Sequence, residues 1–418
     1  MPIHLLSYRL LIIIFSPIIL GHILWLSISN KQSRYFWQRL GFSNSHLPKN
    51  CIWFHCASVG EVNTLLPLLK NLHKKNGQLK IIVTTNTITG SKVIRQQNLD
   101  YLFHSYLPFD WPYAVKRFLL KVKPVSLYVM ETEIWPNLFD SCRNKNIAVY
   151  ILNARLSKKT TTANRWVQSL LSDSLSKVNK IYARSAEHAL AYKKLGAPEN
   201  IIVTTGNLKF TTAIQSTQLI VDNSISINRK YVLLASTHDD EERKIYKRWK
   251  DLNRDELLII APRHPERGSS IIKQLDEASI AVRSKKQAIT DLTKVFLLDT
   301  IGELKQLFPG ASLVIMGGSF VPVGGHNILE PASYKRAIVT GPYMENFKEE
   351  LELMLDKKAI IQVASYDELE KELNKLLNDD DYQSALETNT EKLTHNVAGI
   401  LKDYTDLILR NKSILSTD

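Results

Sequence analysis

Cysteine is scarce in this chain of 418 residues, which contains only Cys51, Cys56 and Cys142. Because three cysteines without metal-ligand spacing cannot form a disulfide scaffold, we expect a reducing, cytosolic setting. HExxH, clustered cysteines and an EF-hand loop are all missing, so we expect no metal. The nicotinamide and P-loop fingerprints, GxGxxG and GxxxxGK[ST], are also missing, and we expect no cofactor. The chain has no aromatic-plus-basic stripe and no recognised nucleic-acid module, so we expect no nucleic-acid partner.

Acidic residues are outnumbered by basic ones. Asp and Glu total 41 and Lys and Arg total 54, which gives a net charge of +13. Such a surplus favours an acidic partner: nucleic acid, an anionic membrane or a phosphorylated substrate. Hydrophobic residues make up 44% and charged residues 23%, which excludes a disordered chain, a collagen-like fibre and a many-helix transporter. The length suggests about two or three domains.

One long apolar run lies near the N-terminus. From Leu10 to Asn30 there is no Asp, Glu, Lys or Arg, and roughly 20 apolar residues are enough for a helix to cross a bilayer. Basic residues follow the run, which by the positive-inside rule places the body in the cytoplasm. We therefore predict a single membrane anchor over residues 1–33. Three alternatives remain open: a shallower interfacial helix, which would suit His22, a secretory signal, and a buried helix of a soluble domain.

The rest of the chain alternates strand and helix patterns, which is typical of α/β domains with parallel sheets. We predict two Rossmann-like domains facing a central cleft, at residues 34–212 and 230–385. A polar linker at 213–229 joins them, and a helical tail covers 386–418. The expected strands are 51–55, 80–84, 126–130, 147–152, 180–183, 201–203, 231–235, 257–261, 295–298, 313–316 and 337–340.

A glycine-rich segment, Gly317–Pro331, follows one of these buried strands and precedes a helix. Paired glycines let backbone amides approach a ligand, and a helix start suits a phosphate. Glu330 could accept hydrogen bonds from two ribose hydroxyls. The alternative is a tight strand–loop–helix junction capped by Asn327.

A second strand-to-helix turn, His55–Glu61, places Glu61 near the start of a helix. One interpretation is structural, because acidic residues stabilise helix N-termini by ~0.3–1 kcal/mol. The other makes Glu61 a general base that takes a proton from a sugar hydroxyl. The helix dipole keeps the carboxylate ionised and lowers its basicity. The residues alone do not decide between the two.

Charged residues follow two further strands. In Met130–Asn137 the carboxylates Glu131 and Glu133, one residue apart in an extended segment, point the same way. They either grip acceptor hydroxyls or an amine, or pair with basic residues in the core. Arg263–Arg267 offers guanidiniums to a carboxylate or phosphate, or is a solvated turn. Thr84–Gly90 and Leu152–Ser157 are hydrogen-bonding loops or caps. The sequence D-x-D at 379–381, a pattern of metal-dependent sugar transferases, is better explained as a helix cap.

Taken together and in order, these motifs resemble the 3-deoxy-D-manno-octulosonic acid (Kdo) transferases that act on lipid A precursors. The resemblance runs from about residue 34 to residue 350. The matching stretches are His55–Glu61, Thr84–Gly90, Tyr106–Asp110, Met130–Asn137, Asn153–Ser157, Gly206–Phe210, Arg263–Arg267, Gly317–Pro331 and Gly341–Phe347.

The resemblance implies a GT-B glycosyltransferase with an N-terminal acceptor domain and a C-terminal donor domain. It implies inverting, metal-independent transfer of Kdo from CMP-Kdo to lipid IVA in lipopolysaccharide synthesis, at the anionic cytoplasmic face of a Gram-negative inner membrane. The glutamate matching Glu61 is that family's catalytic base. The residues expected on the acceptor side are Ser58, Gly60, Thr87, Glu131, Glu133 and Arg155. The residues expected to bind the donor are Arg263, His264, Gly317, Gly318, Ser319, Gly324, Gly325, His326, Asn327 and Glu330.

The sequence departs from the family pattern in three places. Cys56 replaces a usual Ala, Thr211 stands where Asp is frequent, and Ser236–Glu242 replaces a stretch containing Thr-His-Glu-Gly-Glu-Glu. The last change removes a glycine from a turn. Two rival functions remain: another GT-B nucleotide-sugar transferase or epimerase, and a non-enzymatic binder of membrane surfaces.

Overall fold

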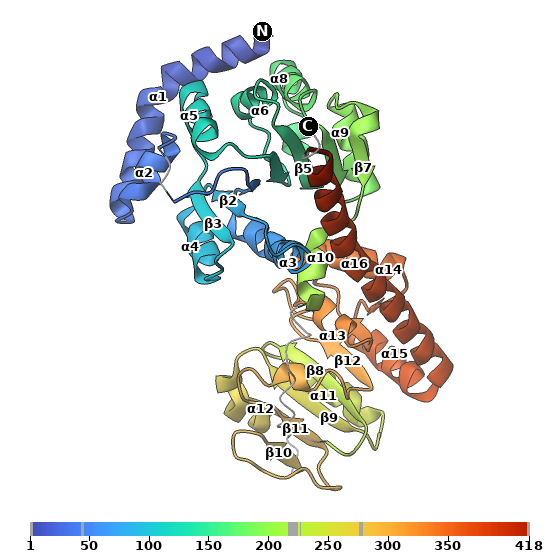
Figure 1. The fold of residues 1–418 in the computed structure, drawn as a ribbon. Coiled ribbons are helices and arrows are strands. Elements are labelled where there is room, and N and C mark those ends of the chain that lie inside the picture. The colour runs from blue at the N-terminus through green and yellow to red at the C-terminus, as the bar shows by residue number, and fades with distance from the viewer. Residues whose placement is uncertain (1–2, 43–45, 216–224, 226, 276–278, 416–418) are drawn as a thin grey trace. The chain divides into compact units, whose positions relative to one another are not determined.

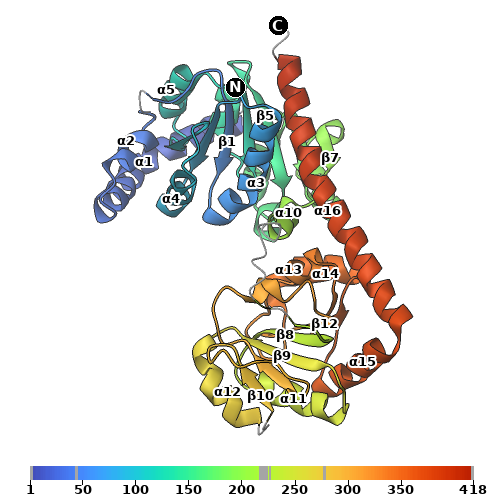
Figure 2. The ribbon, with the colours of Figure 1, turned by 60° about the horizontal axis from the view of Figure 1, so that its bottom comes forward.

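The computed structural model describes residues 3–42, 46–215, 225, 227–275 and 279–415. The chain forms two compact units (Figures 1 and 2). Unit 1 contains residues 1–211 together with 399–418, and unit 2 contains residues 212–398. The expected linker falls partly on residues 216–224 and 226, which lie outside the described residues.

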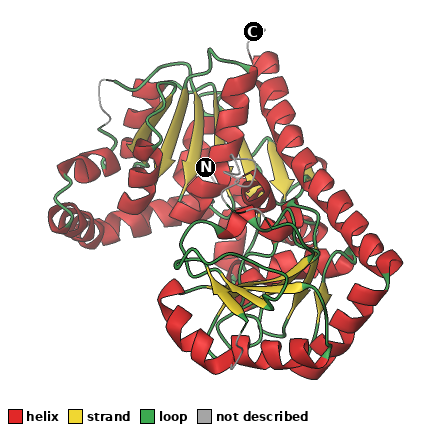
Figure 3. Ribbon diagram, turned by 90° about the horizontal axis from the view of Figure 1, so that it is seen from below, coloured by secondary structure: helices red, strands yellow, loops and turns green. Residues whose placement is uncertain are grey.

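Unit 1 is built on a parallel seven-stranded sheet of order β3-β2-β1-β4-β5-β6-β7. Helices cover the sheet (Figure 3), so its central strands are buried on both faces and consist mostly of apolar residues. The strands are β1 (Ile52–Cys56), β2 (Ile81–Thr85), β3 (Leu102–Tyr106), β4 (Ser126–Met130), β5 (Ala148–Ala154), β6 (Lys180–Ala183) and β7 (Ile202–Thr204). The connecting helices are α3 (Val59–Lys75), α4 (Ile88–Gln96), α5 (Pro112–Val122), α6 (Pro136–Arg143), α7 (Lys158–Thr161), α8 (Arg165–Leu175), α9 (Ala186–Lys194) and α10 (Leu208–Gln215).

Unit 2 repeats the plan with a second parallel sheet, of order β10-β11-β9-β8-β12-β13-β14. Its strands are β8 (Tyr231–Thr237), β9 (Leu257–Pro262), β10 (Ile280–Val282), β11 (Val295–Leu297), β12 (Leu313–Met316), β13 (Ala337–Thr340) and β14 (Ile361–Gln362). Its helices are α11 (Glu241–Asp251), α12 (Gly268–Leu275), α13 (Leu329–Ser333), α14 (Lys348–Asp356) and α15 (Tyr366–Asn378), and α16 (Asp380–Leu415) follows. The prediction of two Rossmann-like α/β halves is therefore confirmed.

Three strands escaped the sequence prediction, and all are short or lie near a sheet edge. β3 is an edge strand that contains His104 and Ser105, and its first three residues are only partly buried. It pairs only with β2, and His104 Nε2 lies 2.9 Å from Thr85 Oγ1. β10 and β14, with three and two residues, end the second sheet on either side. The apolar pattern that identifies strands weakens at edges because these strands have fewer neighbours to pack against.

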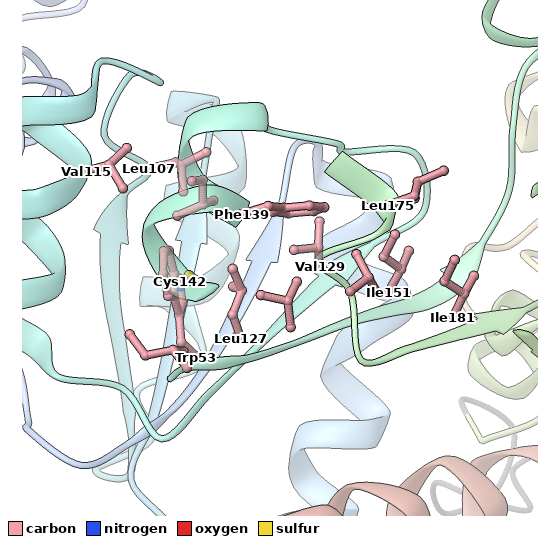
Figure 4. Close-up of a cluster of buried hydrophobic side chains, with 14 of the residues drawn as sticks. Trp53, Leu107, Val115, Leu127, Val129, Phe139, Cys142, Ile151, Leu175 and Ile181 are labelled. Carbon is pink, nitrogen blue, oxygen red and sulfur yellow. The ribbon is translucent and has the colours of Figure 1, made fainter. Parts of the chain in front are cut away.

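Two hydrophobic clusters pack against the sheet of unit 1. Figure 4 shows one of them, where Trp53, Leu127 and Val129 of the sheet meet Phe139 and Cys142 of α6. The other consists of residues that alternate with these along the same strands, and aromatic rings form part of it. Its stacked rings are Phe54, Tyr128, Tyr150 and Tyr182.

The last helix, α16, packs its C-terminal part on this second cluster. Tyr404 is fully buried there, its hydroxyl donates toward Gly206 O at 3.1 Å, and it accepts from Asn153 N at 3.2 Å. A Cβ on Gly206 would lie 2.7 Å from Ile400, and its φ is +101°, so glycine is required at this contact. Asp379 Oδ1 accepts from Tyr382 N at 2.9 Å, which confirms a helix cap at the D-x-D sequence.

The N-terminal apolar run forms α1 (Ile3–Ser29), followed by α2 (Ser33–Arg39). Among the described residues it is the one helix that is long and apolar enough to cross a membrane. Only 17% of its most apolar 18-residue window is buried inside the protein, which argues against a core helix.

Candidate functional sites

The first candidate site lies at the carboxyl ends of four neighbouring strands in unit 1. β2, β1, β4 and β5 are adjacent in the sheet, and predicted acceptor residues follow each of them. Ligands in open parallel sheets bind at this edge. The structure thus brings four separate motifs to one place. The residues are Thr87 after β2, Ser58, Gly60 and Glu61 after β1, Glu131 and Glu133 after β4, and Arg155 after β5.

Glu61 lies in the first turn of α3 and caps that helix. Ser58 is the N-cap residue, and its hydroxyl accepts from Glu61 N at 3.3 Å. In return Glu61 Oε2 accepts from Ala57 N at 2.7 Å. This reciprocal pair is a form of the capping box, in which both bonds satisfy N–H groups at the helix start. The structural interpretation of Glu61 is therefore confirmed, and its second carboxylate oxygen, Oε1, accepts from the Ser58 hydroxyl at 3.3 Å.

The environment of Glu61 makes it more basic than a surface glutamate. The pKa of Glu61 is raised to about 7, chiefly by burial and also by the nearby carboxylates Glu131 and Glu133, while hydrogen bonds from Ala57 N–H and the Ser58 hydroxyl oppose the rise. The N–H group of Ala57 at the helix start does lower the pKa of Glu61, as expected, but burial outweighs it and the net shift is upward. A carboxylate with a pKa close to neutral pH suits a general base.

The two carboxylates after β4 are held by different partners. Glu131 has a φ of +56°, so the segment turns instead of continuing as the extended chain that was expected. Its Oε2 lies 2.6 Å from Arg155 Nε, an ion pair of the kind that the sequence left open. Glu133 Oε2 accepts from Trp135 Nε1 at 3.0 Å and from Asn86 Nδ2 at 3.3 Å. Both carboxylates nevertheless raise the pKa of Glu61.

A buried arginine supports this arrangement and was not predicted. Arg39 Nη1 donates to Asn86 Oδ1 at 3.0 Å and to Leu107 O at 2.7 Å, and burial lowers the pKa of Arg39. Asn86 in turn donates to Glu133. His55 Nε2 lies 3.6 Å from Glu133, too far for a hydrogen bond. Burial alone would raise the pKa of Glu133, but interaction with His55 and the N–H groups of its neighbours lower it overall.

The remaining predicted residues of unit 1 differ in what holds them. Thr87 Oγ1 accepts from Gly90 N at 3.2 Å and caps α4. Gly60 has no packing reason to be glycine, since a Cβ there would meet only Ser58 Oγ at 3.8 Å. The Arg155 side chain is 45% exposed even though it is paired, so it lies at the surface of the site.

The second candidate site lies at the carboxyl ends of β9, β8 and β12, which are adjacent in the sheet of unit 2. Arg263 and His264 follow β9, the glycine-rich segment follows β12, and His238–Glu242 follows β8. This last stretch entered the sequence analysis only as a departure from the family pattern. The structure shows that it organises the other two loops.

Glu241 fastens the glycine-rich segment to the turn after β8. This fully buried side chain accepts from Gly318 N at 2.7 Å, from Phe320 N at 2.9 Å and from His238 N at 2.7 Å. Burial raises the pKa of Glu241, although the three N–H groups oppose that rise. Two amides of the segment that were expected to face a ligand therefore face a carboxylate of the protein.

A second buried glutamate holds the loop after β9. Glu242 Oε1 accepts from Thr237 Oγ1 at 2.6 Å and from Arg267 Nη1 at 2.9 Å. Arg267 also lies 2.9 Å from Asp239. Glu241 and Glu242 could have been found from the sequence. Each is an acidic residue at a strand-to-helix turn, which is the same pattern that identified Glu61.

Three histidines and an exposed arginine gather at this site. His238 Nε2 lies 2.9 Å from His326 Nε2, and the His264 ring lies 5.8 Å from the His238 ring. The pKa of His326 is lowered to about 4, chiefly by burial and also by the neighbouring His238, Arg263 and His264. Burial also lowers the pKa of His238. Carboxylates adjoin the cluster, since Glu241 accepts from His238 N and His264 Nδ1 lies 3.5 Å from Glu266. The exposed Arg263 guanidinium is the group here that suits an anion.

The glycines of the segment are required by the protein's own packing. A Cβ on Gly317 would lie 2.6 Å from Thr237 Cα, and one on Gly324 would lie 2.4 Å from Asn346 Nδ2. Gly324 and Gly325 have φ values of +91° and +75°, a region that favours glycine. The tight-junction interpretation therefore accounts for these glycines, and a ligand is not needed to explain them.

The other predicted residues of the segment are also partly engaged. Ser319 is buried, and its hydroxyl accepts from Gly341 N at 2.7 Å. Asn327 Oδ1 accepts from the first N–H of α13 at 3.1 Å, although the N-cap position itself is occupied by Ile328. Glu330 Oε1 lies 3.2 Å from Lys305 Nζ. Among the described residues, no group of three or more His, Cys, Asp and Glu side chains is placed to hold a metal ion.

Asp240 adopts the conformation of the glycine that it replaces, with a φ of +71°. Asp240→Gly is expected to raise the free energy of unfolding by about 0.5–1 kcal/mol, because it removes the strain of a left-handed side chain. The exposed ion pairs with Arg243 and Lys244 that it loses contribute little. Chemical denaturation measures the change. Asp240→Ala loses the same ion pairs but keeps the strain, so a gain in stability with alanine would contradict this explanation.

Comparisons with known proteins agree with the motifs. Residues 34–212 match the family described as 3-deoxy-D-manno-octulosonic-acid transferase (kdotransferase). The 3-deoxy-D-manno-octulosonic acid transferase of Haemophilus influenzae is 32% identical, over 96% of this chain and 97% of the relative. A probable mitochondrial 3-deoxy-D-manno-octulosonic acid transferase of Arabidopsis thaliana is also 32% identical, over 89% and 87%. The crystal structure of a UDP-GlcNAc 2-epimerase from Neisseria meningitidis is 11% identical with a TM-score of 0.56, over 86% of this chain and 99% of the neighbour. This likeness of fold agrees with the predicted GT-B class.

Proposed function

The chain belongs to the 3-deoxy-D-manno-octulosonic acid transferase family, and on that premise we propose that it transfers Kdo from CMP-Kdo to lipid IVA. The observation that carries the proposal is the half-buried Glu61 carboxylate, with its pKa raised to about 7, at the carboxyl edge of the unit 1 sheet. The family implies a cytoplasmic reaction at the inner membrane in lipopolysaccharide synthesis.

On the acceptor side, Glu61 is the proposed base. Its carboxylate takes the proton of a glucosamine 6-hydroxyl, and the oxygen attacks the anomeric carbon of Kdo from the face opposite the leaving group, which inverts that centre. Glu131 and Glu133 support the step by keeping Glu61 basic. Arg155, paired with Glu131 but partly exposed, is placed to orient a polar group of the acceptor.

On the donor side, the bond from the anomeric carbon to the phosphate oxygen breaks and CMP leaves. Arg263 and the histidines His238, His264 and His326 supply the positive charge and hydrogen-bond donors that stabilise the developing phosphate charge. Because their pKa values are lowered, His238 and His326 are neutral before the donor binds, and an arriving phosphate favours their protonation. We propose that the glycine-rich segment and Glu330 hold the nucleotide, and that transfer needs no metal.

The direct test is to incubate the full chain with CMP-Kdo and lipid IVA and to weigh the lipid product, with EDTA added to one arm. A mass gain of whole Kdo units that EDTA does not change would support the proposal. No gain with folded protein and intact CMP-Kdo would refute the donor–acceptor pair. In that case other nucleotide sugars would be screened on the same fold.

A further inference from the structure

Polar and apolar contacts along its whole length fasten the N-terminal helix α1 to unit 1. Near its start, Arg9 Nη2 lies 2.8 Å from Asp140 Oδ2, and Tyr8 donates to Asp110 Oδ2 at 3.0 Å. At mid-length, Trp111 Nε1 donates to Ser16 Oγ at 2.8 Å. The residues of α1 that face unit 1 recur every three or four positions, as one stripe of a helix does. They are Leu5, Arg9, Ile12, Ser16, Ile19, Ile23 and Ser27.

The partners of this stripe belong to the folded body of unit 1. Asp110 also accepts from the backbone N–H groups of Asn137 and Leu138 at the start of α6. Asp140 lies on α6 and pairs with Lys177 as well as with α1. Figure 1 shows α1 bending part-way along its course, and Pro17 lies inside the helix. The bend lets the helix follow the surface of unit 1.

The opposite face of α1 is apolar and exposed. Of the 22 large hydrophobic side chains that are exposed in the described chain, eleven lie on this one helix. A monomeric soluble protein rarely exposes a continuous apolar surface of this kind. The eleven are Ile3, Leu6, Leu10, Leu11, Ile13, Ile14, Phe15, Ile18, Leu24, Trp25 and Ile28.

An aromatic and basic group of residues adjoins the end of α1. Trp37 and Phe42 meet edge to face at 5.6 Å, and the Arg117 guanidinium lies over the rings of Phe42 and Tyr113. Further exposed basic residues lie on the same segments, the end of α1, α2 and α5, and aromatic rings beside basic side chains are typical of the interface between headgroups and acyl chains. The exposed basic residues of this region are Lys31, Arg34, Lys116, Lys121 and Lys123.

We propose that α1 lies in the plane of one leaflet of an anionic bilayer and does not cross it. A crossing helix would have to leave Asp110 and Asp140, or carry these acidic groups of the folded body into the hydrocarbon, where charges are costly. In the plane, the stripe stays on unit 1 and the opposite face enters the acyl chains. The basic residues around the aromatic rings then meet the anionic headgroups.

Measuring the depth of α1 in a membrane distinguishes a helix in the plane of one leaflet from a helix that crosses the bilayer. Single cysteines at Ile3, Ile14 and Ile28, all at least 68% exposed, would carry spin labels in the full chain on phosphatidylethanolamine–phosphatidylglycerol vesicles. The three native cysteines are buried, so they leave a low background, and the chain without an added cysteine measures it. In the plane, the three labels have similar depths of about 5–10 Å. A middle label at ~15 Å between two shallow ends would overturn the proposal, since the hydrocarbon core is about 30 Å thick.

Vesicle flotation tests which face binds. Ile14→Glu with Ile18→Glu, two exposed positions of α1, is expected to lower the partition coefficient at least about tenfold. The matched control, Leu292→Glu with Ile301→Glu, changes two even more exposed apolar residues of unit 2 and should bind as the parent does. Circular dichroism checks that both variants fold. Equal binding by both variants would overturn the proposal, and so would a parent chain that forms oligomers through α1 without binding vesicles.

Discussion

Glu61→Gln is expected to reduce kcat for Kdo transfer by about 10²–10⁴-fold, the usual contribution of a general base. The amide oxygen of glutamine can still accept from Ala57 N–H, so the capping bond is retained. What is lost is the ability to take the hydroxyl proton. The free energy of unfolding should therefore change by about 1 kcal/mol or less. Single-turnover kinetics with CMP-Kdo and lipid IVA measure the rate, and denaturation measures the stability.

The chain contains a second capping box of the same kind, which serves as the control. At the start of α15, Ser365 accepts from Glu368 N at 3.2 Å, and Glu368 Oε2 accepts from Ala364 N at 2.6 Å. Glu368→Gln therefore changes the same capping box in unit 2, away from the acidic residues around Glu61. If Glu368→Gln slowed transfer as much as Glu61→Gln does, the effect would be one of helix capping, and the catalytic role of Glu61 would be refuted.

The rate is also expected to depend on pH through Glu61. A general base works in its ionised form, and the pKa of Glu61 is raised to about 7, chiefly by burial. We therefore expect kcat to rise with pH up to about 7, with a plateau above it and a tenfold loss per unit well below it. Glu133→Gln removes a neighbouring negative charge, lowers the pKa of Glu61 and moves this limb to lower pH. If the pH dependence of kcat were the same in Glu133→Gln as in the parent, the electrostatic explanation would be contradicted.

The position of Glu61 could be predicted from the sequence, but its chemistry could not. A strand, a turn and an acidic residue at a helix start are visible in His55–Glu61. The raised pKa depends on burial and on Glu131 and Glu133, which are about 70 residues away and come close only because β1 and β4 are neighbours in the sheet. Sequence spacing carries no information about which loops share a sheet edge.

The same limit explains the errors at the other motifs. Glu131 and Glu133 follow a well-predicted strand, yet Glu131 has a φ of +56° and pairs with Arg155, which follows the next strand in the sheet. Arg39 looked like one of several basic residues after an apolar helix. It is in fact buried beneath Asn86 and Glu133. Local sequence patterns predicted the strands and helices. The roles of these side chains depend on contacts between segments that are distant in the sequence.

The glycine-rich segment shows most clearly what a local pattern leaves out. One prediction was that its glycines let a ligand approach the backbone. Several of them instead leave room for neighbouring atoms of the protein. Its shape depends on Glu241, 76 residues before Gly317 in the numbering, whose carboxylate binds two of its amides. A donor site formed by this segment therefore depends on a residue that has no need to touch the donor.

Glu241→Gln is accordingly expected to lower the free energy of unfolding by about 3 kcal/mol. One amide oxygen cannot replace both carboxylate oxygens, and the new NH₂ group faces backbone N–H donors of Gly318 or Phe320. Because the segment would lose its attachment to the turn after β8, the Kd for CMP should rise at least about tenfold, a change of about 1.4 kcal/mol. Denaturation and calorimetric titration with CMP measure the two effects.

A matched change in the same unit distinguishes a specific loss from general weakening. Glu256 is also mostly buried and pairs with Arg254 at 2.8 Å, but it precedes β9 and so lies at the opposite end of the sheet from the candidate site. Glu256→Gln should reduce stability without changing the Kd for CMP. If both variants weakened CMP binding in proportion to their loss of stability, Glu241 would be an ordinary core residue. A weaker affinity in Glu241→Gln alone, at a temperature where both variants are folded, would establish Glu241 as the residue that positions the glycine-rich segment.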